Sequence, residues 1–277
     1  MLKFFVVLLA AYIALVMAMY LMQRSLLYLP ARYDINAAAL TAKDVRAWPD
    51  ADNYSGYLLA NPATGENTST TTVIIFHGNA GSAIDRLYYR DALAFTGARV
   101  LLAEYPGYGR RSGHPTEDSL VNEARSTIAA MAAARPADKL FIIGESLGAG
   151  VAAAAVSDTK TAQHVDGIVL ITPWDSLVKV AARHYWYLPV RWLLRERYDS
   201  IRNLAEYKGP KLLVIASHDT IIPANHAQAL FASLPESKRR LVINGAGHNN
   251  WLGFVDESWW KSLWQYLIDN AAEQVRP

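Results

Sequence analysis

Apolar residues in this chain gather into one long run near the start and six short runs further along. The short runs cover residues 72–76, 99–103, 140–143, 167–171, 211–215 and 240–243. Each is continuous, as in the strands of a parallel sheet whose two faces are both covered. Stretches of helical character lie near 83–95, 116–134, 147–157, 224–234 and 256–271. The alternation predicts an α/β fold with a mostly parallel central sheet and helices on both faces.

The long run extends from Phe4 to Met22 and contains no charged residue. As a helix it would measure about 28 Å, which matches the thickness of the hydrocarbon core of a bilayer. We therefore expect residues 1–23 to form a single-pass N-terminal transmembrane helix. A signal peptide cleaved after Ala18 and a buried core helix are the alternatives. The run continues past Ala18 and shows no amphipathic pattern, and both features favour the anchor.

The charged residues that flank this run do not orient it. Lys3 precedes it, and Arg24 and Arg32 follow it, so the positive charge at its two ends is nearly equal. The positive-inside rule therefore assigns no side of the membrane to the rest of the chain. We expect a membrane protein in which residues 24–50 are a linker and entry segment and residues 51–277 are the folded domain.

The connection from Thr172 to Gly209 is longer than most links between two strands. Long insertions at the carboxyl edge of a parallel sheet often form lids or binding elements. We expect a short helical lid over about residues 173–209. Four of its apolar side chains are predicted to contact substrate: Tyr185, Trp186, Leu188 and Trp192. The alternative is a helical excursion whose aromatic residues pack against one another.

Composition excludes several classes of function. The chain has 277 residues and a formal net charge of +2, and its basic residues form no stripe of the kind that binds nucleic acid. It has no cysteine, which rules out disulfides, thiolate metal sites and a cysteine nucleophile. Zinc-protease and P-loop motifs are absent as well. We therefore expect no metal and no nucleic-acid partner.

A Gly-x-Ser-x-Gly motif follows the third short run and precedes an alanine-rich stretch. It reads Gly144-Glu145-Ser146-Leu147-Gly148. In this strand–turn–helix context the serine lies on a strained turn, where larger flanking side chains would clash. The amides at the start of the following helix favour developing negative charge. We predict that Ser146 is a catalytic nucleophile.

A serine nucleophile needs a base that a carboxylate orients. After this motif the acid and then the histidine follow along the chain. Asp219 follows the fifth run and His248 the sixth, so both should emerge at the same sheet edge as Ser146. Asp175, after the fourth run, is the alternative acid, or it caps the first lid helix. Three other histidines are interpreted as surface or capping residues: His164, His184 and His226.

An acyl-transfer site also needs two amides that stabilise an oxyanion. One should belong to Leu147, directly after the nucleophile. The other should come from the loop after the first short run, Phe76-His77-Gly78-Asn79-Ala80-Gly81. We predict that it belongs to Asn79, and that His77 is structural rather than catalytic.

Taken together, these motifs resemble the α/β-hydrolase superfamily, and within it a group of single-pass membrane-anchored serine hydrolases. That group includes protein depalmitoylases and lysophospholipid lipases. The resemblance covers nearly the whole chain and rests on six segments: Gln23–Tyr28, Phe76–Gly81, Tyr105–Gly109, Gly144–Gly148, Asp219–Pro223 and Gly247-His248. It implies an α/β-hydrolase fold, a triad of Ser146, Asp219 and His248, and hydrolysis of carboxylic esters or thioesters without a cofactor.

Three classes of function remain open. The first is an esterase, thioesterase or lysophospholipase that acts on a small-molecule or lipid-like acyl substrate, since tethering to a membrane raises the local concentration of amphiphiles. The second is a peptidase that uses the same triad, because such triads also cleave amides. The third is a non-catalytic membrane-tethered interaction protein, against which the intact triad and oxyanion positions argue.

Overall fold

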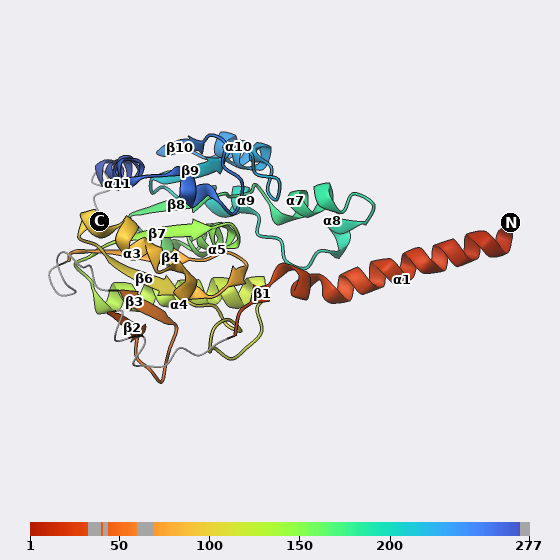
Figure 1. The fold of residues 1–277 in the computed structure, drawn as a ribbon, viewed down its shortest axis with the longest axis horizontal. Helices are drawn as coiled ribbons and strands as arrows, with labels where there is room; N and C mark the ends of the chain where they lie inside the picture. The colour runs from red at the N-terminus through yellow and green to blue at the C-terminus, as the bar shows by residue number, and fades with distance from the viewer. Residues whose placement is uncertain (33–39, 41–43, 60–68, 272–277) are drawn as a thin grey trace.

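The structure, a computed structural model, describes residues 1–32, 40, 44–59 and 69–271. Its centre is an eight-stranded sheet in the order β10-β9-β8-β7-β4-β6-β3-β2 (Figure 1). The strands are β2 (Val45–Trp48), β3 (Gly56–Leu59), β4 (Thr71–Phe76), β6 (Arg99–Ala103), β7 (Lys139–Glu145), β8 (Gly167–Ile171), β9 (Lys211–Ala216) and β10 (Lys238–Ile243). The six strands from β4 and β6 to β10 pair in parallel. The predicted parallel sheet is confirmed.

Two strands at one edge were not predicted. β3 pairs antiparallel with β6, and β2 pairs antiparallel with β3. β2 lies within residues 24–50, so Val45–Trp48 of the predicted linker and entry segment form a strand of the sheet. Both strands have only four residues, which is too short for a periodic signal.

Helices cover both faces of the sheet, because the side chains of each strand point alternately to the two sides. Along β4, Ile74 and Phe76 belong to one buried layer, and Val73 and Ile75 belong to the other. The first layer lies under α4 (Glu117–Ala134), α5 (Leu147–Ala155), α6 (Thr159–Ala162), α9 (Ser200–Leu204) and α10 (Ala224–Ser233). The second lies under α3 (Tyr88–Ala92) and α11 (Glu257–Ala271). Double coverage explains why the inner parallel strands, β4, β6, β7, β8 and β9, are almost continuously apolar.

The helix predicted near 83–95 is broken into three short pieces. They are the 3₁₀ turn η1 (Ala83–Arg86), α3, and the 3₁₀ turn η2 (Ala94–Thr96). Ser82 and Asp85 form a reciprocal capping box that starts the first turn. Gly97, with φ 71°, ends the last one in the left-handed region.

The predicted lid region contains α7 (Leu177–His184), α8 (Val190–Leu193) and α9. Ser176 caps α7 by accepting a hydrogen bond of 3.3 Å from the amide of Lys179. Part of the insertion packs internally: the buried Trp174 donates its indole N–H to the carbonyl oxygen of buried Tyr198, at 3.0 Å. The predicted lid is therefore a set of short helices, held together by the hydrogen bond between Trp174 and Tyr198.

The N-terminal run forms α1 (Leu2–Leu27), a helix with no buried residue. Among the described residues, it is the one helix long and apolar enough to cross a membrane. In Figure 1 it extends away from the sheet, on the side of the molecule where α7 and α8 lie. The chain then forms β1 (Leu29–Pro30), which pairs in parallel with β5 (Ala80–Gly81). The end of α1 is thereby joined to the loop that follows β4.

Candidate active site

The turn that carries Ser146 joins β7 to α5. Ser146 has φ 51° and ψ −110°, a conformation that residues with side chains rarely adopt. Its amide donates to the carbonyl oxygen of Ile171 at 2.9 Å, which fixes the turn against β8. A Cβ on Gly148 would lie 2.0 Å from the carbonyl oxygen of Phe76, and one on Gly144 would lie 2.3 Å from that of Gly148. Both glycines are required by the close approach of backbone to backbone.

His248 lies between Ser146 and Asp219. Its Nε2 is 2.9 Å from Ser146 Oγ, and its Nδ1 is 2.6 Å from Asp219 Oδ2. The other oxygen of Asp219 accepts hydrogen bonds from the amides of Ile221 (2.9 Å) and Ile222 (2.7 Å), so the carboxylate cannot turn away. The side chains of His248 and Asp219 are 10% and 2% exposed. The structure thus brings the three predicted residues into one hydrogen-bonded line.

The alternative acid, Asp175, is bonded elsewhere. Its Oδ1 lies 2.8 Å from His226 Nδ1, and its Oδ2 accepts a hydrogen bond of 2.8 Å from Lys179 Nζ. Burial alone would raise the pKa of Asp175, but the hydrogen bonds from Lys179 and His226 outweigh it and hold the pKa below its ordinary value. Asp175 is not the cap of α7, which is Ser176. His226 is buried against Asp175 and is not the surface residue that we expected.

The loop after β4 passes close to the nucleophile. A Cβ built on Gly78 would lie 3.8 Å from Ser146 Cβ. The next residue, Asn79, lines the same pocket as Ser146. Its side-chain amide donates to the carbonyl oxygen of Leu27 at 2.9 Å, and its own carbonyl oxygen accepts from Tyr108 Oη at 2.8 Å. These two bonds hold the residue whose backbone N–H is the predicted oxyanion donor.

The buried side chain of His77 supports this loop. Its ring is 1% exposed and lies 2.8 Å from the carbonyl oxygen of Gly78 and 3.1 Å from Glu104 Oε1. Its own carbonyl oxygen accepts a hydrogen bond from Tyr105 Oη at 2.9 Å. These contacts fix the backbone of the loop and agree with a structural role.

The chain is similar in sequence to known proteins. A family model described as the alpha/beta hydrolase fold matches residues 71–206. Over 241 residues the chain is 33% identical to an uncharacterized protein of Mycobacterium tuberculosis. The match spans 85% of this chain and 83% of that protein. The chain belongs to the α/β-hydrolase family. The resemblance to the superfamily is confirmed, and the narrower likeness to membrane-anchored members stays a prediction.

Solved structures of other proteins share the fold of this chain at low sequence identity. An esterase of Pyrococcus furiosus has a TM-score of 0.65 and 20% identity, over 88% of this chain and 98% of that one. A monoacylglycerol lipase of Paleococcus ferrophilus has a TM-score of 0.53 and 19% identity, over 77% of this chain and 97% of that one. These likenesses support the α/β-hydrolase fold that the sequence predicted.

The pocket at Ser146 contains a polar cluster that the sequence analysis did not single out. The pocket has a volume of about 270 Å³, and its lining includes Arg86, Tyr88 and Glu145. Glu145 receives hydrogen bonds from Arg86 Nε at 2.8 Å, from Tyr89 Oη at 2.6 Å and from the hydroxyl of Tyr88. Burial and the adjacent Glu145 carboxylate raise the pKa of Tyr88 well above its ordinary value, so its hydroxyl remains a donor. The cluster fixes the residue directly before the nucleophile.

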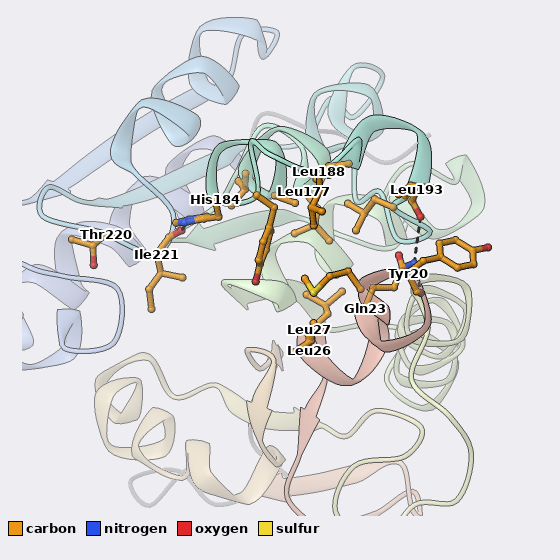
Figure 2. Close-up of a pocket in the computed structure, with 16 residues that line it drawn as sticks. Tyr20, Gln23, Leu26, Leu27, Leu177, His184, Leu188, Leu193, Thr220 and Ile221 are labelled. Carbon is orange, nitrogen blue, oxygen red and sulfur yellow. Dashed lines mark hydrogen bonds between the residues drawn. The ribbon is translucent and has the colours of Figure 1, made fainter. Parts of the chain in front are cut away.

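A second, apolar cavity of about 390 Å³ lies between α1 and the lid (Figure 2). Of the four predicted substrate-binding residues, Tyr185 and Leu188 line it. Trp186 and Trp192 do not line it, and their side chains are 80% and 84% exposed. The lid turn after α7 directs alternate residues inward and outward, and sequence alone does not tell which is which. The opposite wall, supplied by α1, was not predicted.

Proposed function

We propose that this hydrolase is a membrane-anchored serine hydrolase that cleaves carboxylic esters or thioesters of acyl chains through an acyl-enzyme on Ser146. The observation that carries the proposal is the position of the His248 ring, with Nε2 at 2.9 Å from the serine oxygen and Nδ1 at 2.6 Å from Asp219. This is the geometry in which a histidine takes a proton from a serine while a carboxylate stabilises the imidazolium.

The reaction follows from the positions of these atoms. Ser146 Oγ attacks the carbonyl carbon of the ester or thioester while His248 Nε2 takes the hydroxyl proton. Collapse of the tetrahedral intermediate breaks the bond to the leaving alcohol or thiol, which receives that proton from His248. A water molecule then attacks the acyl-enzyme, His248 removes its proton, and the acid is released as Ser146 is restored.

In this proposal two backbone amides donate hydrogen bonds to the oxyanion. Leu147 is the first residue of α5, where the unpaired N–H groups of a helix and its dipole favour negative charge. Asn79 contributes its backbone N–H from the facing loop. Donors of this kind act on the charge that develops in the transition state and account for a large part of the rate.

An acyl substrate is favoured by the surroundings of the site. The cavity beside the lid is almost entirely apolar in its lining, as a hydrocarbon chain requires. The apolar helix α1, which we propose to be a membrane anchor, would hold the site at a bilayer surface where amphiphilic esters are concentrated.

The proposal is tested by turnover of defined substrates. The full-length protein in detergent micelles should hydrolyse p-nitrophenyl acetate and octanoate and the matching acyl thioesters, with kcat/KM for each measured directly. Ser146→Ala should lower kcat/KM by at least about a thousandfold, since catalysis without the nucleophile retains only binding and oxyanion effects. Ser258→Ala, a change at an exposed serine, should leave the rates at the wild-type level. Equal rates for Ser146→Ala and the wild type would refute the assignment.

A further inference from the structure

The apolar cavity beside the lid has two walls that come from distant parts of the chain. Leu177, Val180 and Leu188 line it from the lid (Figure 2). Across from them lie Met19, Tyr20, Gln23, Leu26 and Leu27 of α1. Its volume, about 390 Å³, is within the range of about 300–1,000 Å³ that holds small ligands. The N-terminal helix therefore forms part of a pocket, in addition to its proposed role as a membrane anchor.

One stripe of α1 faces the lid. The partly buried residues of the helix are Val16, Met19, Tyr20, Gln23 and Leu27, and their spacing of three or four residues places them on one side. Neighbouring residues such as Leu21 and Met22 are exposed on the other side. The stripe is not more apolar than the rest of the helix, so the sequence shows no amphipathic pattern.

Polar contacts hold this stripe in register with the lid. Gln23 Nε2 donates to the carbonyl oxygen of Leu193 at 3.3 Å, and Gln23 Oε1 accepts from the amide of Arg195 at 2.8 Å. One turn earlier the ring of Tyr20 lies under the guanidinium of Arg195, 4.4 Å from its centroid. A buried carboxylate, Glu196, pairs with Arg24 Nε at 2.5 Å. These contacts fix both walls although no residue of α1 is fully buried.

The cavity adjoins the catalytic residues at two points. Leu27 lines it, and the carbonyl oxygen of Leu27 accepts the hydrogen bond from Asn79, which lines the pocket of Ser146. Thr220 and Ile221 also line it, directly after Asp219, whose carboxylate accepts from the amide of Ile221. The apolar cavity therefore lies next to the segments that hold Asn79 and Asp219, and its lining residues are distinct from those of the Ser146 pocket.

The lid contacts α1 far from its last turn. Tyr12 Oη donates to the carbonyl oxygen of Tyr187 at 3.0 Å, and Tyr12 lies fifteen residues, about 22 Å of helix, before Leu27. Trp186 and Trp192 are exposed on this part of the lid. Exposed tryptophans are favoured at the interface between lipid and water. Any bilayer that surrounds this part of α1 thus reaches the lid.

We propose that α1 forms one wall of the acyl-chain site of this enzyme, and that the chain enters the cavity sideways from the bilayer between α1 and α7. This proposal rests on the proposed esterase or thioesterase function and adds to it where the acyl chain is bound. The anchor then determines chain-length preference as well as location.

A substitution that fills the cavity from the α1 side tests the proposal. Met19→Trp enlarges a cavity-lining side chain, and Leu21→Trp is the matched control because residue 21 lies about 200° around the same helix and is exposed. For the full-length protein in lipid nanodiscs, kcat/KM is measured on p-nitrophenyl acetate, octanoate and dodecanoate. Each buried methylene is worth about fourfold in binding. Met19→Trp should lower the ratio of dodecanoate to acetate by about tenfold or more, and Leu21→Trp should leave the ratio unchanged. An unchanged ratio in both variants would overturn the proposal while the esterase assignment stands.

A second measurement does not depend on turnover. The wild type and both variants are irradiated with a diazirine-bearing palmitic acid, and adducts on residues 177–194 are counted by mass spectrometry. Adducts there should appear in the wild type, persist in Leu21→Trp and fall severalfold in Met19→Trp. Equal adduct formation in all three proteins would overturn the proposal, whether or not the protein cleaves esters.

Discussion

The side-chain amide of Asn79 donates a hydrogen bond of 2.9 Å to the carbonyl oxygen of Leu27, the last residue of α1. Two residues later, the amide of Leu29 donates to the carbonyl oxygen of Asn79, also at 2.9 Å. The loop that we propose to supply an oxyanion amide is therefore held by the chain that leaves the apolar helix. The helix α1 and the candidate active site are connected through these two hydrogen bonds.

Removing the Asn79 side chain should slow the chemical step. Asn79→Ala keeps the backbone N–H but loses the bond to Leu27, so we expect kcat on an octanoate ester to fall about tenfold. That is less than the roughly 10²–10³-fold loss that follows removal of an oxyanion donor itself. Asn53→Ala, at an exposed residue, should have no effect. Wild-type kcat in Asn79→Ala would show that the loop does not need this bond.

The two candidate acids should separate clearly in kinetics. Asp219→Asn should lower kcat by about 10³–10⁴-fold, because the neutral amide favours the wrong histidine tautomer. Asp175→Asn should lower it less than about tenfold, since Asp175 contacts Lys179 and His226 rather than His248. Both variants are measured for kcat on the same ester. Losses of equal size would contradict the assignment of Asp219.

The nucleophile turn should tolerate no side chain at Gly148. Gly148→Ala places a methyl group 2.0 Å from the carbonyl oxygen of Phe76, and backbone must move to admit it. We expect the free energy of unfolding to fall by about 2 kcal/mol or more. Gly253→Ala is the control, because a Cβ there meets nothing within 4 Å, and its effect should stay within about 0.5 kcal/mol. Chemical denaturation of both variants measures the difference; equal stabilities would contradict the packing argument.

Residues on the two sides of the lid turn should differ in their effect on chain length. Leu188 lines the cavity, so Leu188→Ala should lower the ratio of kcat/KM for dodecanoate to that for acetate severalfold. Trp186 is 80% exposed, so Trp186→Ala, assayed in micelles, should change this ratio of kcat/KM values less than Leu188→Ala does. A larger change for Trp186→Ala would mean that the lid closes over substrate in another conformation.

Much of the fold follows from the sequence because its strongest signals are local. Five of the parallel strands, β4, β6, β7, β8 and β9, are buried on both faces, and continuous apolar runs such as Leu140–Ile143 predict this burial; the edge strand β10 is largely exposed. The nucleophile turn is equally local, since Gly144 and Gly148 are required within five residues by contacts that any such turn makes. The order of Asp219 and His248 after it then places both at one sheet edge.

The features that the sequence did not predict depend on contacts between distant segments. β2 and β3 are short edge strands whose pairing, rather than their composition, defines them. The cavity joins Met19 to residues more than 150 positions away, and nothing in the α1 pattern marks that face. Trp186 and Leu188 are both apolar and two residues apart, so only the path of the turn decides which one lines the cavity.

The central claim is that Ser146 is an activated nucleophile, and a fluorophosphonate probe tests it most directly. The detergent-solubilised full-length protein and Ser146→Ala are incubated with the probe, and covalent labelling is read by mass spectrometry of the intact chain and of its peptides. We predict one adduct on the wild type, located at Ser146, and none on Ser146→Ala. A folded wild type that takes up no probe, or a Ser146→Ala variant labelled to the same extent, would contradict the account.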